Sequence, residues 1–309
     1  MPINYISILR CFALLIIINS HCGAFYGSFS FLGTGGAVGN ALFFFTSGYT
    51  LCLGNKNIGF GKWMLKRIIR IYPSVWLFLL LSNLFLEGKY YYSDFFITPF
   101  WFVNAIFVFY ILFYAVIKYI PNKIPLVICI LSVPYLLTYF LLNDYSIFLI
   151  DYVSNATFLH WYYYFAIMLF GAFCSNHLIK VKRPSICFLL AMFVYFTIKC
   201  IVKHFEILIP MQFIIPFGLF FVCKYALVLS KKIESCLLVR KNIFRIVGYL
   251  SRLSLETYIV QFSIIAFFER IDIPCTLIFV FITVILSADI INRLSGFSRR
   301  FLNKFVPIF

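Results

Sequence analysis

The chain has 309 residues, of which 63% are apolar and 12% are charged, and its mean hydropathy is +1.00. Soluble globular domains carry about 45–50% apolar and about 25% charged residues. This composition excludes an ordinary soluble enzyme, a disordered tail and a nucleic-acid-binding domain, although the net charge is +16. A multi-span α-helical membrane protein accounts for both values, because such proteins collect Lys and Arg on their cytoplasmic loops.

Apolar runs separated by charged residues, Pro or Gly indicate how many spans the chain contains. A span needs about 20 mostly apolar residues. Ten runs meet or approach this length, which predicts an all-α, polytopic transmembrane bundle of about ten spans. The runs are 6–24, 36–54, 73–87, 98–118, 125–142, 158–175, 185–203, 209–229, 246–267 and 274–292. They leave almost no room for a soluble domain, so we expect residues 1–309 to form a single membrane-embedded domain.

The distribution of basic residues predicts the orientation of these spans. With both termini placed in the cytoplasm, 22 of the 26 Lys and Arg residues fall on the inner side. The outer side then holds only Lys89, Lys199, Lys203 and Arg270. An excess of Lys and Arg in cytoplasmic loops is the usual signature of membrane topology. We therefore expect both termini to be cytoplasmic.

The first apolar segment carries two ionisable residues, Arg10 and His21. Eleven helical steps of 100° bring both side chains to one face, about 16 Å apart along the axis. One reading is a polar stripe that lines a water-filled cavity, since ionisable residues inside spans are costly and usually functional. The other reading is a pair of interfacial anchors, one at each end. The pKa of a histidine lies near neutrality, so His21 is the candidate for proton transfer.

The next segment begins with a glycine-rich stretch and continues into an apolar helix. Gly33, Gly35 and Gly36 favour tight turns and close backbone approach. The stretch is not a phosphate-binding P-loop, because no GK[ST] follows it. Ser47 falls inside the apolar helix, where its hydroxyl has a role in the site or bonds back to its own backbone.

A dense basic patch precedes the third apolar run. Lys66 and Arg70 are spaced so that they share a helix face, as are Arg67 and Arg70. Pro73 is expected to break or kink the helix. The patch is either a consequence of the positive-inside rule with lipid headgroups bound, or an anion site in which Arg forks grip phosphates.

A carboxylate lies within the ninth apolar run. Arg252 and Glu256 are four residues apart, a spacing at which two helical side chains pair. A buried carboxylate requires a partner, and Arg10 of the first span is an alternative candidate.

These features follow one another in an order that resembles the bacterial integral-membrane acyltransferase family three, the O-acetyltransferases of cell-surface sugars. The resemblance covers most of the chain. It rests on Arg10 and His21, on Gly35 to Tyr49, on Arg67 and Arg70 before Pro73, on Trp101 and Phe102 followed by Tyr110, and on Ser254, Leu255, Glu256 and Tyr258. Members of the family often carry a His three residues after that last Tyr, where this chain has Gln261.

The resemblance implies that acetyl-CoA is the donor, used as a co-substrate from the cytoplasm, and that no metal takes part. Lys66, Arg67 and Arg70 would hold its phosphates. His21 would act as general base or form a transient acyl-histidine, with Arg10 orienting the donor. Glu256 would fix the tautomer of the histidine or a basic partner. Ser47, Tyr49, Trp101, Ser254 and Tyr258 would support the substrate or the site.

The resemblance also implies a location in the bacterial inner (plasma) membrane, with membrane lipids as partners and no nucleic acid. The acceptor would be a lipid-linked oligosaccharide or another glycan at the outer face. Outer aromatic runs at 90–92 and 161–164 either stack on sugar rings or form an interfacial belt. Three alternatives remain: transfer of succinyl or another acyl group, a glycolipid or polysaccharide transporter, and a glycan polymerase or ligase. The short outer loops disfavour the last.

Overall fold

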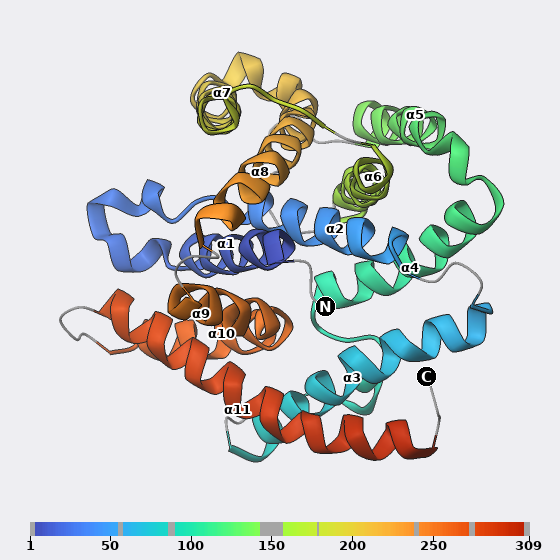
Figure 1. Ribbon diagram of the computed structural model, residues 1–309. Coiled ribbons are helices and arrows are strands. Elements are labelled where there is room, and N and C mark those ends of the chain that lie inside the picture. Colours follow the sequence, from blue (N-terminus) through green and yellow to red (C-terminus); the bar gives the residue numbers. More distant parts are fainter. Residues whose placement is uncertain are drawn as a thin grey trace. The chain divides into compact units, whose positions relative to one another are not determined.

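A computed structural model describes residues 4–54, 58–85, 90–142, 157–177, 179–237, 241–271 and 276–305 (Figure 1). Three basic residues used in the topology argument, Lys56, Lys89 and Arg240, lie outside the described residues. All regular elements in the described ranges are helices. The expected all-α class is therefore confirmed.

Eleven α-helices and four short 3₁₀ segments follow one another in the described parts of the chain. They are α1 (Asn4–His21), η1 (Gly23–Leu32), α2 (Gly36–Cys52), α3 (Phe60–Phe85), η2 (Tyr92–Phe95), α4 (Trp101–Tyr119), η3 (Pro121–Lys123), α5 (Ile124–Leu142), α6 (Thr157–Asn176), α7 (Pro184–His204), η5 (Glu206–Ile214), α8 (Ile215–Leu237), α9 (Lys241–Arg252), α10 (Ser254–Phe268) and α11 (Thr276–Phe305).

Six described segments are long and apolar enough to cross a membrane. They are α3, α4, the residues of η3 and α5 together, α7, the residues of η5 and α8 together, and α11. A seventh arises if α1 and η1, which are bent by 103° at their junction, form one span. The expectation of several spans is confirmed, whereas the count of ten and the cytoplasmic termini stay predictions.

Two boundaries differ from those expected. α3 runs without interruption from Phe60 to Phe85 and contains Pro73, so the basic patch belongs to the same helix as the apolar run. Of the two expected effects of Pro73, a break or a kink, the break does not occur. The ninth apolar run is divided by a turn at Leu253 into α9 and α10. α9 is strongly amphipathic, with basic residues at both ends, which is typical of a helix at a membrane surface.

The described chain divides into two compact units, each of which consists of three separate stretches of the sequence. Unit 1 comprises residues 1–13, 37–56 and 115–244, and unit 2 comprises residues 14–36, 57–114 and 245–309. α1 contributes its first part to unit 1 and its second part to unit 2. It is a single helix from Asn4 to His21, as the spacing of its two ionisable residues requires.

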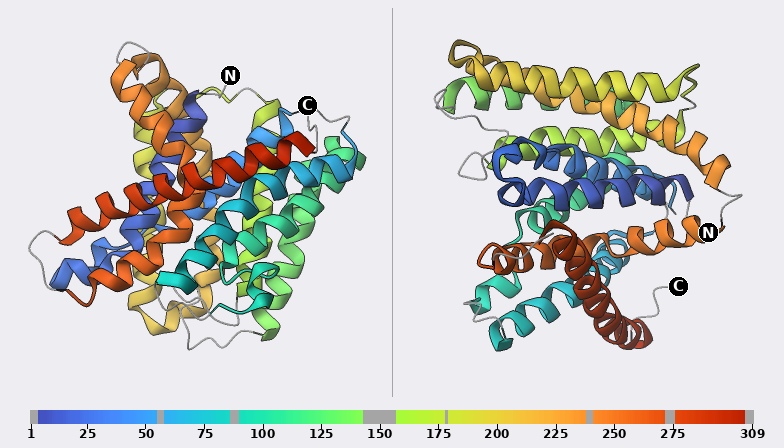
Figure 2. Two further views of the ribbon diagram at one scale, coloured as in Figure 1. Left: turned by 90° about the horizontal axis from the view of Figure 1, so that it is seen from below. Right: turned by 90° about the vertical axis from the view of Figure 1, so that its left-hand side faces the viewer.

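Unit 1 is built from helix pairs, with α7 lying along α8 and α5 along α6 (Figure 2). Two glycines let α2 approach α6 closely. A Cβ atom added at Gly48 would lie 1.8 Å from the carbonyl oxygen of Met168, and one at Gly171 would lie 2.1 Å from that of Phe45. Gly48 is therefore required by helix packing, because small residues permit such contact between apolar helices.

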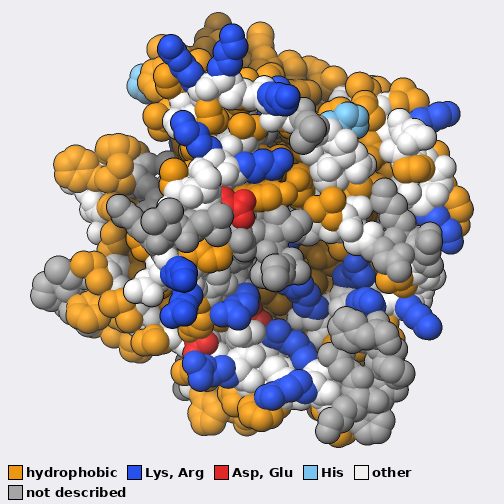
Figure 3. Space-filling view, viewed as in Figure 1, with side chains coloured by type: hydrophobic (Ala, Val, Ile, Leu, Met, Phe, Trp, Pro, Cys, Tyr) orange, Lys and Arg blue, Asp and Glu red, His pale blue; other side chains and the backbone are white. Residues whose placement is uncertain are grey.

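Unit 2 is organised around α3, α10 and α11, which pack on one another. The glycine-rich stretch forms the tight turn that was expected, with Gly35 at a φ of +104°, which a side chain would disfavour. Figure 3 shows Lys and Arg side chains over most of this face of the molecule, some of them over α9 and α11, with few Asp or Glu among them.

Candidate functional site

Glu256 forms a buried ion pair at the centre of unit 2. The residue lies in the first turn of α10 and is 2% exposed. Its Oε1 accepts hydrogen bonds from Arg299 Nη2 of α11 at 2.6 Å and from Ser74 Oγ of α3 at 2.8 Å. One carboxylate therefore joins three helices, and its charge is compensated as burial requires.

The guanidinium of Arg299 is at the centre of a larger polar cluster. Its Nη2 lies 2.7 Å from Ser74 Oγ and 2.6 Å from Ser295 Oγ, and Asn292 Oδ1 is 3.4 Å away. Arg299 was assigned to the inner basic residues by sequence and not to the site. The signal that could have found it is its spacing from Asn292 and Ser295, seven and four residues, which puts three polar groups on one face of α11.

The partner expected for Glu256 was Arg252 or Arg10. The structure places Arg299 there instead. Because the turn at Leu253 separates Arg252 from α10, these two residues do not share a continuous helix. The four-residue spacing consequently does not produce an ion pair, and Arg252 is exposed.

His21 occupies the last turn of α1 and is exposed. Its ring packs edge-on against Phe262 of α10, with the ring centroids 4.7 Å apart. Neither ring nitrogen is hydrogen-bonded to a residue that the structure describes. Within the described residues, the ring is therefore held by its packing against Phe262 and by no hydrogen bond.

Tyr258 links α10 to the start of α4. Its ring lies 5.0 Å from that of Phe102 and 5.9 Å from that of Phe262. Trp101 begins α4 and packs edge-on against Phe102 at 6.0 Å. Two of the motifs used above, the Trp-Phe pair and the stretch around Glu256, thus meet in unit 2, where half-buried Ser254 begins α10.

The basic patch on α3 contains two kinds of arginine. The guanidinium of Arg67 stacks over the ring of Trp63 at 3.8 Å, and its Nη1 donates to the Trp63 carbonyl at 2.6 Å. Tyr110 closes this aromatic wall, 5.8 Å from Trp63 between ring centroids. Arg70 is exposed, and Lys66 is half-buried. Arg67 is thus fixed in orientation, whereas Arg70 is presented to the surroundings.

The predicted site residues in unit 1 lie where the start of α1 meets the end of α2. Arg10 donates from Nη2 to Thr50 Oγ1 at 3.3 Å. The hydroxyl of Tyr49 lies 2.9 Å from that of Tyr5, and Lys231 Nζ is 5.2 Å from the Tyr5 ring. Ser47, about one helical turn before Thr50 on α2, is half-buried. The structure adds Lys231, which sequence reasoning did not assign.

The two outer aromatic runs differ in exposure. Tyr91 and Tyr92 are 72% and 92% exposed, which suits either an interfacial belt or sugar stacking. Tyr163 and Tyr164 are buried inside unit 1. For these two rings neither sugar stacking nor an interfacial belt holds, because both side chains are buried in the protein.

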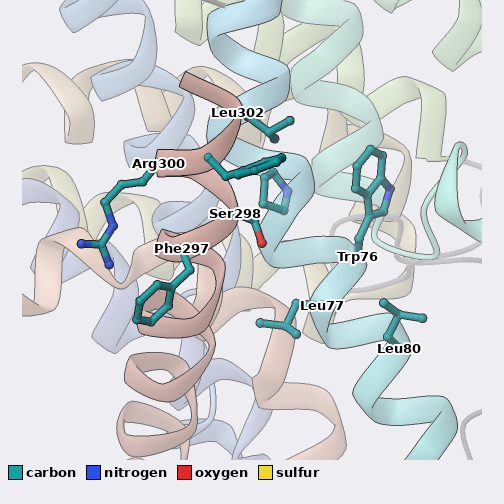
Figure 4. A pocket seen from close by; sticks show the side chains of 9 residues that line it. Trp76, Leu77, Leu80, Phe297, Ser298, Arg300 and Leu302 are labelled. Atoms are coloured by element: carbon teal, nitrogen blue, oxygen red, sulfur yellow. The ribbon is translucent and has the colours of Figure 1, made fainter. Parts of the chain in front are cut away.

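An open apolar groove of about 890 Å³ lies between α3 and α11 (Figure 4). Trp76, Leu77 and Leu80 of α3 line it, and Phe297 and Ser298 belong to the opposite wall. The predicted site residues do not line this groove. Ser74 and Arg299 of the polar cluster do not line it either, although each is next to a lining residue in the sequence.

The chain is similar to a known protein family. The profile of the acyltransferase domain, acyltransferase family 3, matches residues 3–292, which is nearly the whole chain. No curated protein and no solved structure matches the chain. Together with the apolar helices, the match establishes a multi-pass membrane protein with acyltransferase character. The chain belongs to acyltransferase family 3.

Proposed function

We propose that the protein transfers an acetyl group from cytoplasmic acetyl-CoA to a hydroxyl of a lipid-linked or cell-surface glycan, with His21 as general base. The observation that carries this proposal is the placement of His21. Its ring is exposed, its nitrogens are not engaged by described residues, and it packs against Phe262 on the same helix that carries buried Glu256. This arrangement holds a titratable imidazole on an ordered helix and leaves it open to substrate.

The chemical step needs one proton acceptor. A ring nitrogen of His21 removes the proton of the sugar hydroxyl as its oxygen attacks the thioester carbonyl carbon. The tetrahedral intermediate collapses, the carbon–sulfur bond breaks, and the thiolate takes the proton from the imidazolium. The products are the sugar ester and CoA. An acyl-histidine formed by direct attack of the imidazole is the second route to the same products.

The donor is held from the inner side by α3. Exposed Arg70 and half-buried Lys66 bind phosphate oxygens, because guanidinium and ammonium groups pair strongly with phosphates. The guanidinium of Arg67 donates to the carbonyl oxygen of Trp63 and stacks with one face on the Trp63 ring. It therefore supplies positive charge at a fixed position.

Glu256 serves this site as an anchor. Its Oε1 is occupied by Arg299 and Ser74, so we assign it no proton transfer. The ion pair fixes α10 to α3 and α11 and thereby positions Phe262 against His21. Of the two roles expected for Glu256, this one corresponds to fixing a basic partner, here Arg299, and not to fixing the tautomer of the histidine.

Transfer of succinyl or another acyl group uses the same residues and differs only in the donor. Passage of a glycolipid without chemistry would use the same polar groups. Membership in an acyltransferase family favours transfer over transport.

Donor binding tests the proposal most simply. Detergent-purified protein is heated with acetyl-CoA, free CoA, succinyl-CoA or ATP, and the unfolding temperature is recorded. We expect acetyl-CoA to stabilise the wild type most, and the Arg67→Ala/Arg70→Ala double variant to lose this effect. Arg300→Gln, an exposed arginine on α11, is the control and should respond like the wild type. Equal stabilisation by ATP, or none at millimolar donor, would contradict the donor assignment.

A further inference from the structure

Gln261 is a fully buried amide that the fold leaves without a hydrogen-bond partner. The residue lies on α10 and is 0% exposed. Neither Nε2 nor Oε1 has a hydrogen-bond partner among the residues that the structure describes. Because buried polar side chains are nearly always satisfied, each exception needs an explanation.

A second polar group accompanies it on the same face of the helix. Thr257 lies four residues earlier, is 2% exposed, and its Oγ1 also has no partner within the described ranges. Residues four apart are neighbours on a helix surface. α10 therefore carries a short buried polar stripe, Thr257 and Gln261.

The neighbouring ion pair shows that this part of the fold can satisfy buried groups. Glu256, adjacent in sequence, has both a cation and a hydroxyl at hydrogen-bond distance. Core packing does not explain the stripe, since leucine would fill the place of Gln261 without desolvating an amide. The two side chains are therefore suited to bind a polar group of a substrate during turnover.

The position of the stripe relates it to the proposed base. Gln261 immediately precedes Phe262, whose ring packs against His21. Consecutive Cα atoms are about 3.8 Å apart. Gln261 and the ring that packs against His21 therefore belong to the same turn of α10, with their side chains on different faces of the helix.

We propose that Gln261 and Thr257 bind a secondary amide of the substrate, namely an amide in the pantetheine arm of the acyl-CoA donor. A primary amide offers an N–H donor and a carbonyl acceptor side by side, and a secondary amide offers the complementary pair. A neutral ligand fits a stripe without charge of its own. A thin chain reaches a completely buried residue more readily than a sugar ring. This inference rests on the proposed donor, and an N-acetylated sugar is the competing source of the same chemistry.

If the two side chains bind a ligand, removing their polar groups should raise the stability of the ligand-free protein and weaken ligand binding. Gln261→Leu removes the amide and keeps a similar volume, so it should raise the unfolding temperature of the ligand-free protein by roughly 2 °C or more. It should also weaken binding of S-acetylpantetheine about tenfold, as expected for the loss of two hydrogen bonds. Thr257→Val should act in the same direction with smaller effects.

Gln212→Leu is the matched control. Gln212 is 2% exposed and already interacts with neighbouring groups, so its replacement should lower the unfolding temperature and leave ligand binding unchanged. If Gln261→Leu instead destabilises the protein as Gln212→Leu does, or binds S-acetylpantetheine as tightly as the wild type, the proposal is overturned.

Two further probes separate this inference from the proposed function. Wild-type stabilisation by N-acetylglucosamine but not by S-acetylpantetheine would assign the stripe to the acceptor and overturn the donor assignment. Failure of the wild type to bind acetyl-CoA and S-acetylpantetheine would refute the proposed donor itself. Binding by the wild type that Gln261→Leu retains would refute only the role of Gln261.

Discussion

The ion pair of Glu256 and Arg299 gives a quantitative prediction. Glu256→Gln leaves the guanidinium of Arg299 without its carboxylate in a site where the glutamate side chain is 2% exposed and the arginine side chain 24% exposed. Removing one partner of a buried pair costs about 3–5 kcal/mol. Because Arg299 is partly accessible, we expect a value near the lower end, about 3 kcal/mol. For a chain of this size that lowers the unfolding temperature by roughly 6 °C.

A double-mutant cycle separates the pair from its surroundings. Arg299→Gln should lower the free energy of unfolding about as much as Glu256→Gln does. In the double variant the loss should be smaller than the sum of the two single losses by about 1–3 kcal/mol. Thermal unfolding of the four purified proteins provides the measurement. Arg300→Gln, next to Arg299 but exposed, should change stability by less than about 0.5 kcal/mol. Strictly additive losses would refute the claim that the two charges stabilise each other.

Three other substitutions probe separate contacts. Gly48→Ala should lower stability by at least about 2 kcal/mol, because its Cβ would overlap the Met168 carbonyl oxygen; unchanged unfolding would show that α2 and α6 are not closely packed. Arg67→Lys should reduce both stability and donor affinity, because the stack on the Trp63 ring is lost, whereas Arg70→Lys should reduce donor affinity alone. Identical behaviour of the two variants in thermal shift assays would contradict this division of roles. Ser74→Ala should cost about 1 kcal/mol, measured by the same unfolding assay, and no loss would mean that its hydroxyl is not needed by the polar cluster.

Much of the helical fold was predictable, because apolar runs that are long enough to span a membrane form helices. Each of the ten predicted runs has a helix over most of its length. The sequence did not reveal that α3 passes through Pro73, since a proline within a long apolar helix is tolerated when neighbouring contacts hold it. Nor did it reveal the turn at Leu253, which no proline or glycine marks.

Candidate site residues could be named from the sequence, but their pairings could not. Glu256 was identified as a buried carboxylate, yet its partner lies 43 residues away on α11, a distance at which local spacing carries no information. The same holds for Phe262 against His21. Gly48 was expected as part of a motif, but only the contact with α6 explains why a side chain is not tolerated.

The central claim is that this chain acylates a glycan with His21 as base. The most direct measurement is the O-acetyl content of the cell-surface glycan, by mass spectrometry, in cells that carry the wild type, His21→Ala or His21→Gln as the sole copy. Membrane levels and unfolding temperatures of the three proteins must match. The account predicts that both variants lose O-acetylation, by about 10²–10⁴-fold in rate. Acetylation at the wild-type level in either well-folded variant would contradict it.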